Sequence, residues 1–106
     1  MEDVNRIRAR EMATIMKALG HPYRVRLMEL LTDGSWSVGE LAQHLGTDVS
    51  STSKHLLILK NAGLAFVKKR GLHAYYYTGC HCIANFHKCV QEMLADALKK
   101  RIRMLD

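Results

Sequence analysis

The sequence predicts a winged helix-turn-helix, a mainly α fold with a β-hairpin wing. Residues 37–62 have the pattern of a helix, a turn and a second helix, and residues 64–78 alternate as the two strands of a hairpin would. Long stretches of helical periodicity flank both segments. With 106 residues, one proline and 48% hydrophobic residues, the chain suits a single globular domain over residues 1–106.

The first third of the chain predicts two helices. Residues 3–18 carry an apolar stripe at helical spacing, and the Gly20, His21, Pro22 sequence breaks it. Pro22 suits the first turn of a second helix, which Gly34 ends. Trp36 then lies where a very short strand could pair with the hairpin.

The third helix is predicted from its signals at both ends. Ser37 with Glu40 three residues later forms a capping-box pattern, and Gly46 suits a left-handed helix end. Either Thr47 or Asp48 can then cap a fourth helix. A short turn between two such helices is typical of a DNA-reading helix-turn-helix, although an ordinary helical hairpin has the same outline.

The fourth helix has two different faces. Its helical spacing turns Thr52, Leu56 and Leu59 inward. The opposite face at the front of the helix is small and polar, with Ser50, Ser53 and Lys54. We therefore expect this helix to be the recognition helix.

Residues 64–78 predict a hairpin with a basic tip. An isolated hairpin is marginal in water, so we expect it to pack on the helices through Leu64, Phe66 and one face of residues 75–77. Its basic residues are Lys68, Lys69, Arg70 and His73. A charge run is usually solvated surface, but the position next to a recognition helix favours phosphate binding.

The composition narrows the classes of function. The net charge of +6 suits a polyanionic partner. The sequence shows no membrane-length apolar run and no apolar signal region, and its three cysteines are expected to be reduced thiols in the cytoplasm. An enzyme is not expected, because the cysteines and histidines lack an orienting acid and the chain lacks a Gly-rich phosphate loop. A winged-helix protein-interaction module is the rival class.

Residues 83–104 predict a last long helix with a broad apolar face that includes Phe86, Val90 and Leu94. The first and last helices are longer than the core of one winged domain requires. Their apolar stripes therefore predict a homodimer through these two helices, although both could instead fold onto their own domain.

Several motifs in series resemble the ArsR–SmtB family of metal-responsive repressors. They are ALGHPYRVRLMELL from residue 18, SVGELAQHLG from residue 37, SSTSKHLLILKNAGL from residue 50, and HAYYYT from residue 73. The resemblance covers about residues 12–78. It implies a homodimer that binds an imperfect palindrome in double-stranded DNA, blocks transcription, and is released by an inducer that is commonly a metal or metalloid.

The DNA-binding residues predicted from this resemblance and from the charge pattern are Val49, Ser50, Ser51, Ser53, Lys54, His55, Lys60, Lys68, Lys69, Arg70 and His73. Val49 stands where many relatives have Gln. Valine cannot make the bidentate contact to adenine that Gln makes, but it can meet a thymine methyl group. The operator sequence is therefore expected to differ from the commoner pattern.

Two inducer sites that the resemblance suggests are absent from this chain as they are usually built. The stretch at residues 37–41 lacks the two cysteines of one site, and the last helix lacks the later histidine of another. Instead, five soft or borderline ligands lie within ten residues. The predicted ligands are Cys80, Cys82 and Cys89, with His81 and His87 as additional candidates.

Three thiolates suit arsenite or antimonite, and added imidazoles suit zinc or cadmium. Thiol redox sensing and a purely structural role for the cysteines are the alternatives, and no constitutive cofactor is expected. If Cys82 and Cys89 are both helical, they lie about 10 Å apart along the axis, too far to share one ion. Either Cys80 and Cys82 precede the helix in a loop that folds back, or both subunits supply ligands.

Overall fold

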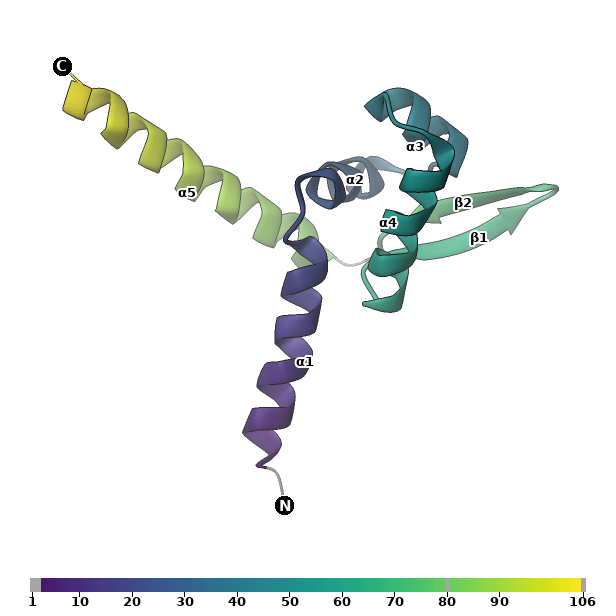
Figure 1. Cartoon of the computed structure of the whole chain (residues 1–106), viewed down its shortest axis with the longest axis horizontal. Coiled ribbons are helices and arrows are strands. Elements are labelled where there is room, and N and C mark those ends of the chain that lie inside the picture. Colours follow the sequence, from purple (N-terminus) through teal and green to yellow (C-terminus); the bar gives the residue numbers. More distant parts are fainter. Residues whose placement is uncertain (1–2, 80, 106) are drawn as a thin grey trace.

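The elements occur in the order predicted from the sequence, and the winged helix-turn-helix is confirmed. The computed structural model describes residues 3–79 and 81–105. The elements (Figure 1) are α1 (Val4–Leu19), α2 (Pro22–Asp33), α3 (Val38–Leu45), α4 (Val49–Asn61), β1 (Phe66–Arg70), β2 (His73–Tyr77) and α5 (His81–Leu105).

The break between α1 and α2 lies where the sequence predicts it. Gly20 follows the last residue of α1, and Pro22 occupies the first turn of α2. His21 caps α2, because its Nδ1 accepts a hydrogen bond of 3.1 Å from the Tyr23 amide. This cap satisfies a helix N–H group that has no partner within the helix.

The core lies where α2, α3 and α4 meet. Its most deeply buried side chains are leucines: two about one turn apart on α2 (Leu27 and Leu31), two on α4 (Leu56 and Leu59), and Leu41 on α3. Thr52 is buried with them at 0% exposure, so the predicted inward face of α4 is confirmed.

Trp36 joins the hairpin to the helices, as predicted. Its backbone amide donates to the Tyr76 carbonyl at 2.9 Å, and the Tyr76 amide donates to the Trp36 carbonyl at 2.7 Å. The indole N–H donates to the Leu30 carbonyl at 2.8 Å. The base of the wing is thereby held to α2.

Strands β1 and β2 pair antiparallel, from Phe66 opposite Tyr77 to Arg70 opposite His73. Gly71 begins the two-residue turn at φ +63°, as the first position of a type II′ hairpin turn requires. The prediction that Phe66 packs on the helices was wrong, because its side chain is 44% exposed. Leu64 and Ala65 are the residues buried at the start of the hairpin.

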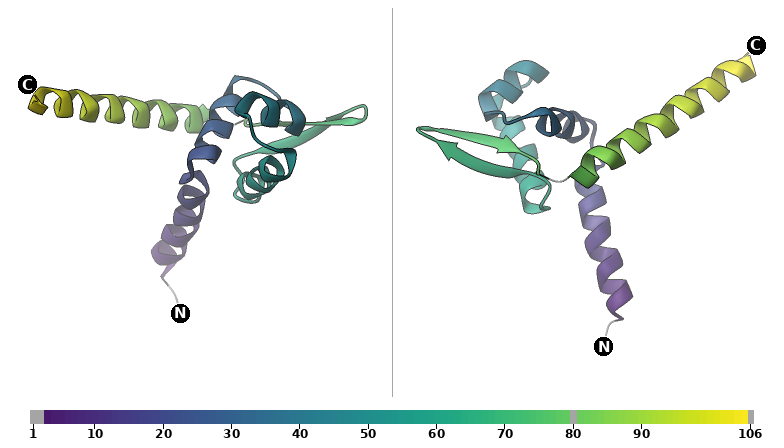
Figure 2. Two further views of the ribbon diagram at one scale, coloured as in Figure 1. Left: turned by 45° about the horizontal axis from the view of Figure 1, so that its top comes forward. Right: turned by 180° about the vertical axis from the view of Figure 1, so that it is seen from behind.

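Helices α1 and α5 extend away from the core in different directions, as the two views of Figure 2 show. Ala18 is the buried residue of α1, and none of the described residues of α5 is buried. The apolar stripes of both helices are therefore largely exposed. Over residues 3–79 and 81–105, no helix combines the length and apolar character needed to cross a membrane.

Candidate nucleic-acid interface and C-terminal cysteines

The capping box at the start of α3 is present as predicted. The Glu40 amide donates to the Ser37 hydroxyl at 3.1 Å, and the Ser37 amide donates to the Glu40 carboxylate at 2.9 Å. The hydrogen bond from the Ser37 amide, followed by hydrogen bonding from the Ser37 side chain, holds the pKa of the Glu40 carboxyl below its usual value. The helix before the turn is thus fixed at its first residue.

The turn between α3 and α4 depends on one glycine. Gly46 has φ +68°, the left-handed conformation that side chains disfavour. Its amide donates to the Gln43 carbonyl at 3.3 Å, and the Thr47 amide donates to the Ala42 carbonyl at 3.0 Å. This is the Schellman pattern, which ends α3 sharply, and α4 begins at Val49, three residues after Gly46.

Asp48 caps the recognition helix α4. Its carboxylate accepts a hydrogen bond of 3.1 Å from the Ser51 amide. Hydrogen bonding by Ser51, through its side chain first and then its amide, holds the pKa of Asp48 below its usual value. The first turn of α4 is therefore held in place with its outward side chains exposed.

Most side chains on the outward face of α4 are exposed to solvent. Val49 is 51% exposed, and Ser50, Ser53, Lys54 and Lys60 are exposed as well, whereas Ser51 is partly buried. Leu57 lies one helical turn after Ser53 and is also exposed. The sequence reasoning did not assign Leu57 a role, although its position relative to Ser50 and Lys54 places it on their face.

His55 lies between this face and α2. Its ring is 4.6 Å from the ring of His21 and 5.0 Å from that of Tyr23, and its Nδ1 is 3.2 Å from Nη1 of Arg24. Burial of the imidazole, followed by the charges of His21 and Arg24, lowers the pKa of His55. Much of its contact surface is therefore directed to α2.

The basic residues of the wing are not equivalent. Lys69, Arg70 and His73 are exposed. Lys68 is partly buried, with its Nζ 5.0 Å from the ring centre of Tyr77, in a cation–π contact. The three exposed cationic or titratable side chains are thus the ones most available to a phosphate backbone.

The two described cysteines of α5, Cys82 and Cys89, lie apart from each other within one subunit. Cys82 lies in the helix, which excludes the first of the two alternatives, a loop that holds both Cys80 and Cys82 before the helix; Cys80 lies outside the described residues. Cys89 is a free, exposed thiol seven residues further along, whereas Cys82 is disulfide-bonded, so the prediction that all three cysteines are reduced thiols was wrong. Across residues 3–79 and 81–105, no three metal-binding side chains come together. His81 is exposed at the first turn.

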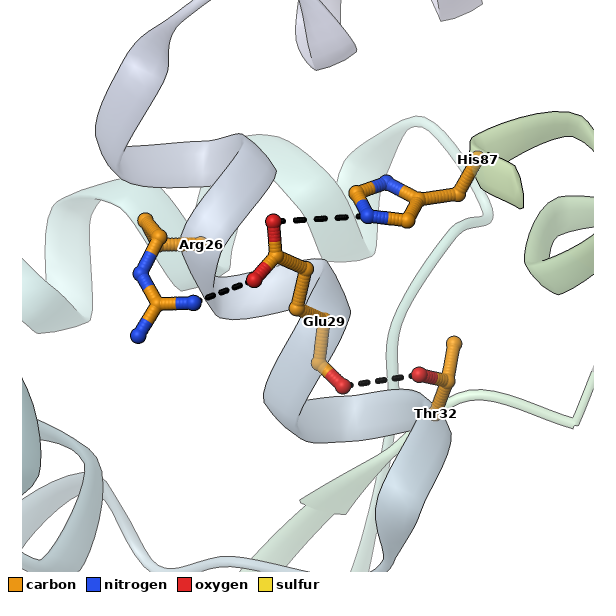
Figure 3. A network of polar contacts seen from close by, with 4 residues as sticks. All are labelled: Arg26, Glu29, Thr32 and His87. Atoms are coloured by element: carbon orange, nitrogen blue, oxygen red, sulfur yellow. Dashed lines mark hydrogen bonds and ion pairs between the residues drawn. The ribbon is translucent and has the colours of Figure 1, made fainter. Parts of the chain in front are cut away.

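His87, the other candidate ligand, contacts α2 (Figure 3). Its Nε2 lies 3.3 Å from a carboxylate oxygen of Glu29, which is also paired with Arg26. The nitrogen is buried and has no acceptor in hydrogen-bonding geometry among the described residues. Sequence reasoning missed Glu29, because 58 positions separate two groups that meet only in the folded chain.

The comparisons with known proteins agree with this geometry. Residues 21–66 match the profile of the family described as bacterial regulatory protein, arsR family. Rv0081 of Mycobacterium tuberculosis, an uncharacterized HTH-type transcriptional regulator, is 33% identical over 95 residues, which are 89% of this chain and 83% of the relative. The biofilm growth-associated repressor of Xylella fastidiosa is 35% identical over 75 residues, which are 71% of this chain and 65% of that protein.

Solved structures show the same fold. The crystal structure of M. tuberculosis Rv0081 has a TM-score of 0.79 at 30% identity and covers 96% of this chain and 99% of its own. The homodimeric winged helix-turn-helix DNA-binding domain of Mb0332 from Mycobacterium bovis has a TM-score of 0.84 at 25% identity, with 94% and 93% covered. The resemblance seen in the sequence is confirmed: the chain belongs to the arsR family of bacterial regulatory proteins, which are DNA-binding transcriptional regulators and not enzymes.

Proposed function

We propose that this chain is a cytoplasmic repressor that inserts α4 into the major groove of an operator and sets its wing on the neighbouring phosphates. The observation that carries this proposal is the front of α4, where a tightly capped first turn presents small polar side chains outward. Such a face can approach base edges closely. In this proposal Val49, the first residue of α4, meets a thymine methyl group, because its side chain is apolar and exposed.

The wing supplies contacts of a different kind. Lys69, Arg70 and His73 lie around a tight turn at the end of the hairpin, away from the core. Contacts from such side chains to phosphates fix the position of a protein on DNA without reading its sequence. In the proposed complex α4 discriminates between sequences and the wing adds affinity.

We also propose that the chain acts as a homodimer. Two extended helices leave apolar side chains exposed, among them Met12, Met16, Phe86, Val90 and Leu94. A largely apolar groove of about 510 Å³ between α1, α2 and α5 adds to this surface. Contiguous apolar surface of this kind is typical of protein interfaces, and a second copy supplies an equally apolar helix. Two recognition helices related by a two-fold axis would read the two halves of a palindrome.

Matched substitutions on α5 test the dimer. Leu94→Lys places a charge in the groove, whereas Glu92→Lys places the same side chain about 160° further around the helix. We expect sedimentation velocity to show a dimer for the unchanged protein and for Glu92→Lys, and a monomer for Leu94→Lys. A dimer that survives Leu94→Lys would argue against this seam.

The inducer is proposed to be a thiophilic ion, most simply arsenite or antimonite, bound by the thiols of α5. Cys82 and Cys89 are two helical turns apart, so one ion cannot bind both within a subunit. In a dimer the ion would bridge thiols of both copies, and the disulfide at Cys82 would first have to be reduced. That disulfide also favours a second candidate, release from DNA by thiol oxidation.

One titration distinguishes these inducers. A labelled duplex is first recovered by selection from a random-sequence pool, and the reduced protein is bound to it and followed by fluorescence anisotropy. We expect near-stoichiometric arsenite to release the duplex, and Cys89→Ser to prevent the release. Release by zinc or cadmium alone would assign mixed thiolate and imidazole ligands, and release by hydrogen peroxide alone would assign redox sensing. A protein that shows no preference for any selected duplex would refute the operator-binding proposal itself.

A further inference from the structure

We propose that Tyr23 and Arg24, at the start of α2, are positioning residues for the recognition helix. Neither side chain belongs to the outward face of α4. Both contact α4 from behind, and together they fix its first turn and its middle relative to the rest of the domain. The inference rests on the proposed reading of DNA by α4.

A directed chain of hydrogen bonds joins Tyr23 to the cap of α4. The Thr52 hydroxyl donates to the Asp48 carbonyl at 2.8 Å and lies 2.7 Å from the Tyr23 hydroxyl. A carbonyl oxygen can only accept, so the single hydroxyl hydrogen of Thr52 is committed to Asp48. The Tyr23 hydroxyl must therefore donate to Thr52.

The position of Thr52 makes this chain hard to replace. Its side chain is 0% exposed, so bulk water cannot substitute for the tyrosine hydroxyl. The Asp48 carbonyl also accepts the Thr52 amide at 3.2 Å, while the Asp48 carboxylate accepts the Ser51 amide. Tyr23 is thus connected to the one residue that caps the turn from which Val49 and Ser50 project.

Arg24 links α4 to a different helix. Its Nε donates to the Ala18 carbonyl and its Nη2 to the Lys17 carbonyl at 3.4 Å, both in the last turn of α1. Its Nη1 lies 3.2 Å from Nδ1 of His55 in the middle of α4. Because a guanidinium only donates, Nδ1 of His55 accepts and the ring proton is on Nε2. The guanidinium of Arg24 therefore makes its contacts within the domain, between α1 and α4.

A positioning role has a distinct signature in DNA binding. Hydrogen bonds to base edges depend on the position of the helix in the groove, whereas flexible lysine and arginine side chains reach phosphates from many positions. A shifted α4 therefore loses sequence discrimination. It keeps its nonspecific affinity and its salt dependence, because no phosphate contact is removed.

The test compares the selected duplex with a scrambled duplex of equal length and composition. We expect Tyr23→Phe to weaken binding to the selected duplex about tenfold and to the scrambled duplex less than about twofold. Thr52→Val should show the same selective loss of affinity. The double variant should lose no more affinity for the selected duplex than Thr52→Val alone, because both substitutions interrupt the same series of hydrogen bonds. Thr32→Val is the matched control: its hydroxyl donates to the Glu29 carbonyl at 2.7 Å, on the far side of α2 from this chain.

Arg24→Lys provides a second, charge-conserving variant. Lysine keeps the positive charge but cannot hold the α1 carbonyls and His55 with one planar group, so we expect the same selective loss with an unchanged salt slope. Equal losses on both duplexes with a lower melting temperature would show a merely structural role and overturn the inference. Unchanged discrimination in Tyr23→Phe and Arg24→Lys would overturn it as well. An unchanged protein that does not discriminate would instead refute the proposed function.

Discussion

His87 on α5 and Glu29 on α2 face each other, with Nε2 of the imidazole 3.3 Å from Oε1 of the carboxylate. Helix α5 buries none of its described residues, and this contact and the packing of Ile83 on the core both lie near its start. Arg26 pairs with the same carboxylate from within α2. Glu29 therefore stands between the cysteine-bearing helix and the DNA-reading part of the chain.

Removing Glu29 should loosen the start of α5. We expect Glu29→Ala to raise amide hydrogen exchange several-fold around Ile83 and His87, because fewer contacts then oppose local opening. Arg26→Ala is the control, since it removes the other partner of Glu29 and leaves His87 in place. Equal exchange in the two variants would show that the contact does not anchor α5.

The residues of the wing should differ in their contribution to DNA binding. Each phosphate contact contributes about 0.9 to the slope of log affinity against log salt concentration. We expect Lys69→Gln and Arg70→Gln each to reduce the slope by about this amount. Lys68→Gln should reduce it less, because Lys68 lies over the Tyr77 ring. The slopes are measured by anisotropy between about 50 and 200 mM salt, and a larger effect of Lys68→Gln would contradict this ranking.

The capping box should contribute measurably to stability. Ser37→Ala removes the hydroxyl that accepts from the Glu40 amide, and we expect it to lower the free energy of unfolding by about 1 kcal/mol. Urea denaturation measures this loss. Ser35→Ala, two residues earlier at an exposed position outside the box, should leave the midpoint unchanged.

Acid should destabilise the fold through His55. Its pKa is lowered in the folded chain, chiefly by burial, so the unfolded chain binds the proton more strongly. Stability is therefore retained above the ordinary pKa of 6.5 and falls as the pH drops through that value. We expect the melting temperature to fall between about pH 7.5 and pH 5.5, and to fall less in His55→Asn.

The control for this pH effect is His44→Asn, on the exposed surface of α3. It should keep the full decrease in melting temperature. If His55→Asn and the unchanged protein show the same pH dependence, the histidine does not remain neutral at the α2–α4 contact.

The features that the sequence predicted correctly depend on residues that lie close together along the chain. Ser37 and Glu40 fix the start of α3, Gly46 its end, and the spacing from Thr52 to Leu59 the buried face of α4. Each of these signals lies within about two helical turns, where helix geometry alone relates the residues.

The sequence could not predict contacts between distant segments. Phe66 alternates correctly for a strand, but which face the core covers depends on how Trp36 pairs with Tyr76. Tyr23 and Thr52 are 29 positions apart, and their hydrogen bond exists only once α2 crosses α4. For Cys82, the residue type alone suggested a thiolate ligand. Which thiols can approach one another depends on where α5 begins, and the sequence did not fix that residue.

No described residue of α5 is fully buried within its own chain, and most of the apolar stripe of this helix is exposed. In the proposed dimer, the partner copy covers the apolar face of α5. The fraction of dimer therefore depends on the protein concentration. Repression then responds to the number of copies in the cell as well as to a chemical signal. Dilution by growth would vacate operators without any inducer, and renewed synthesis would restore them.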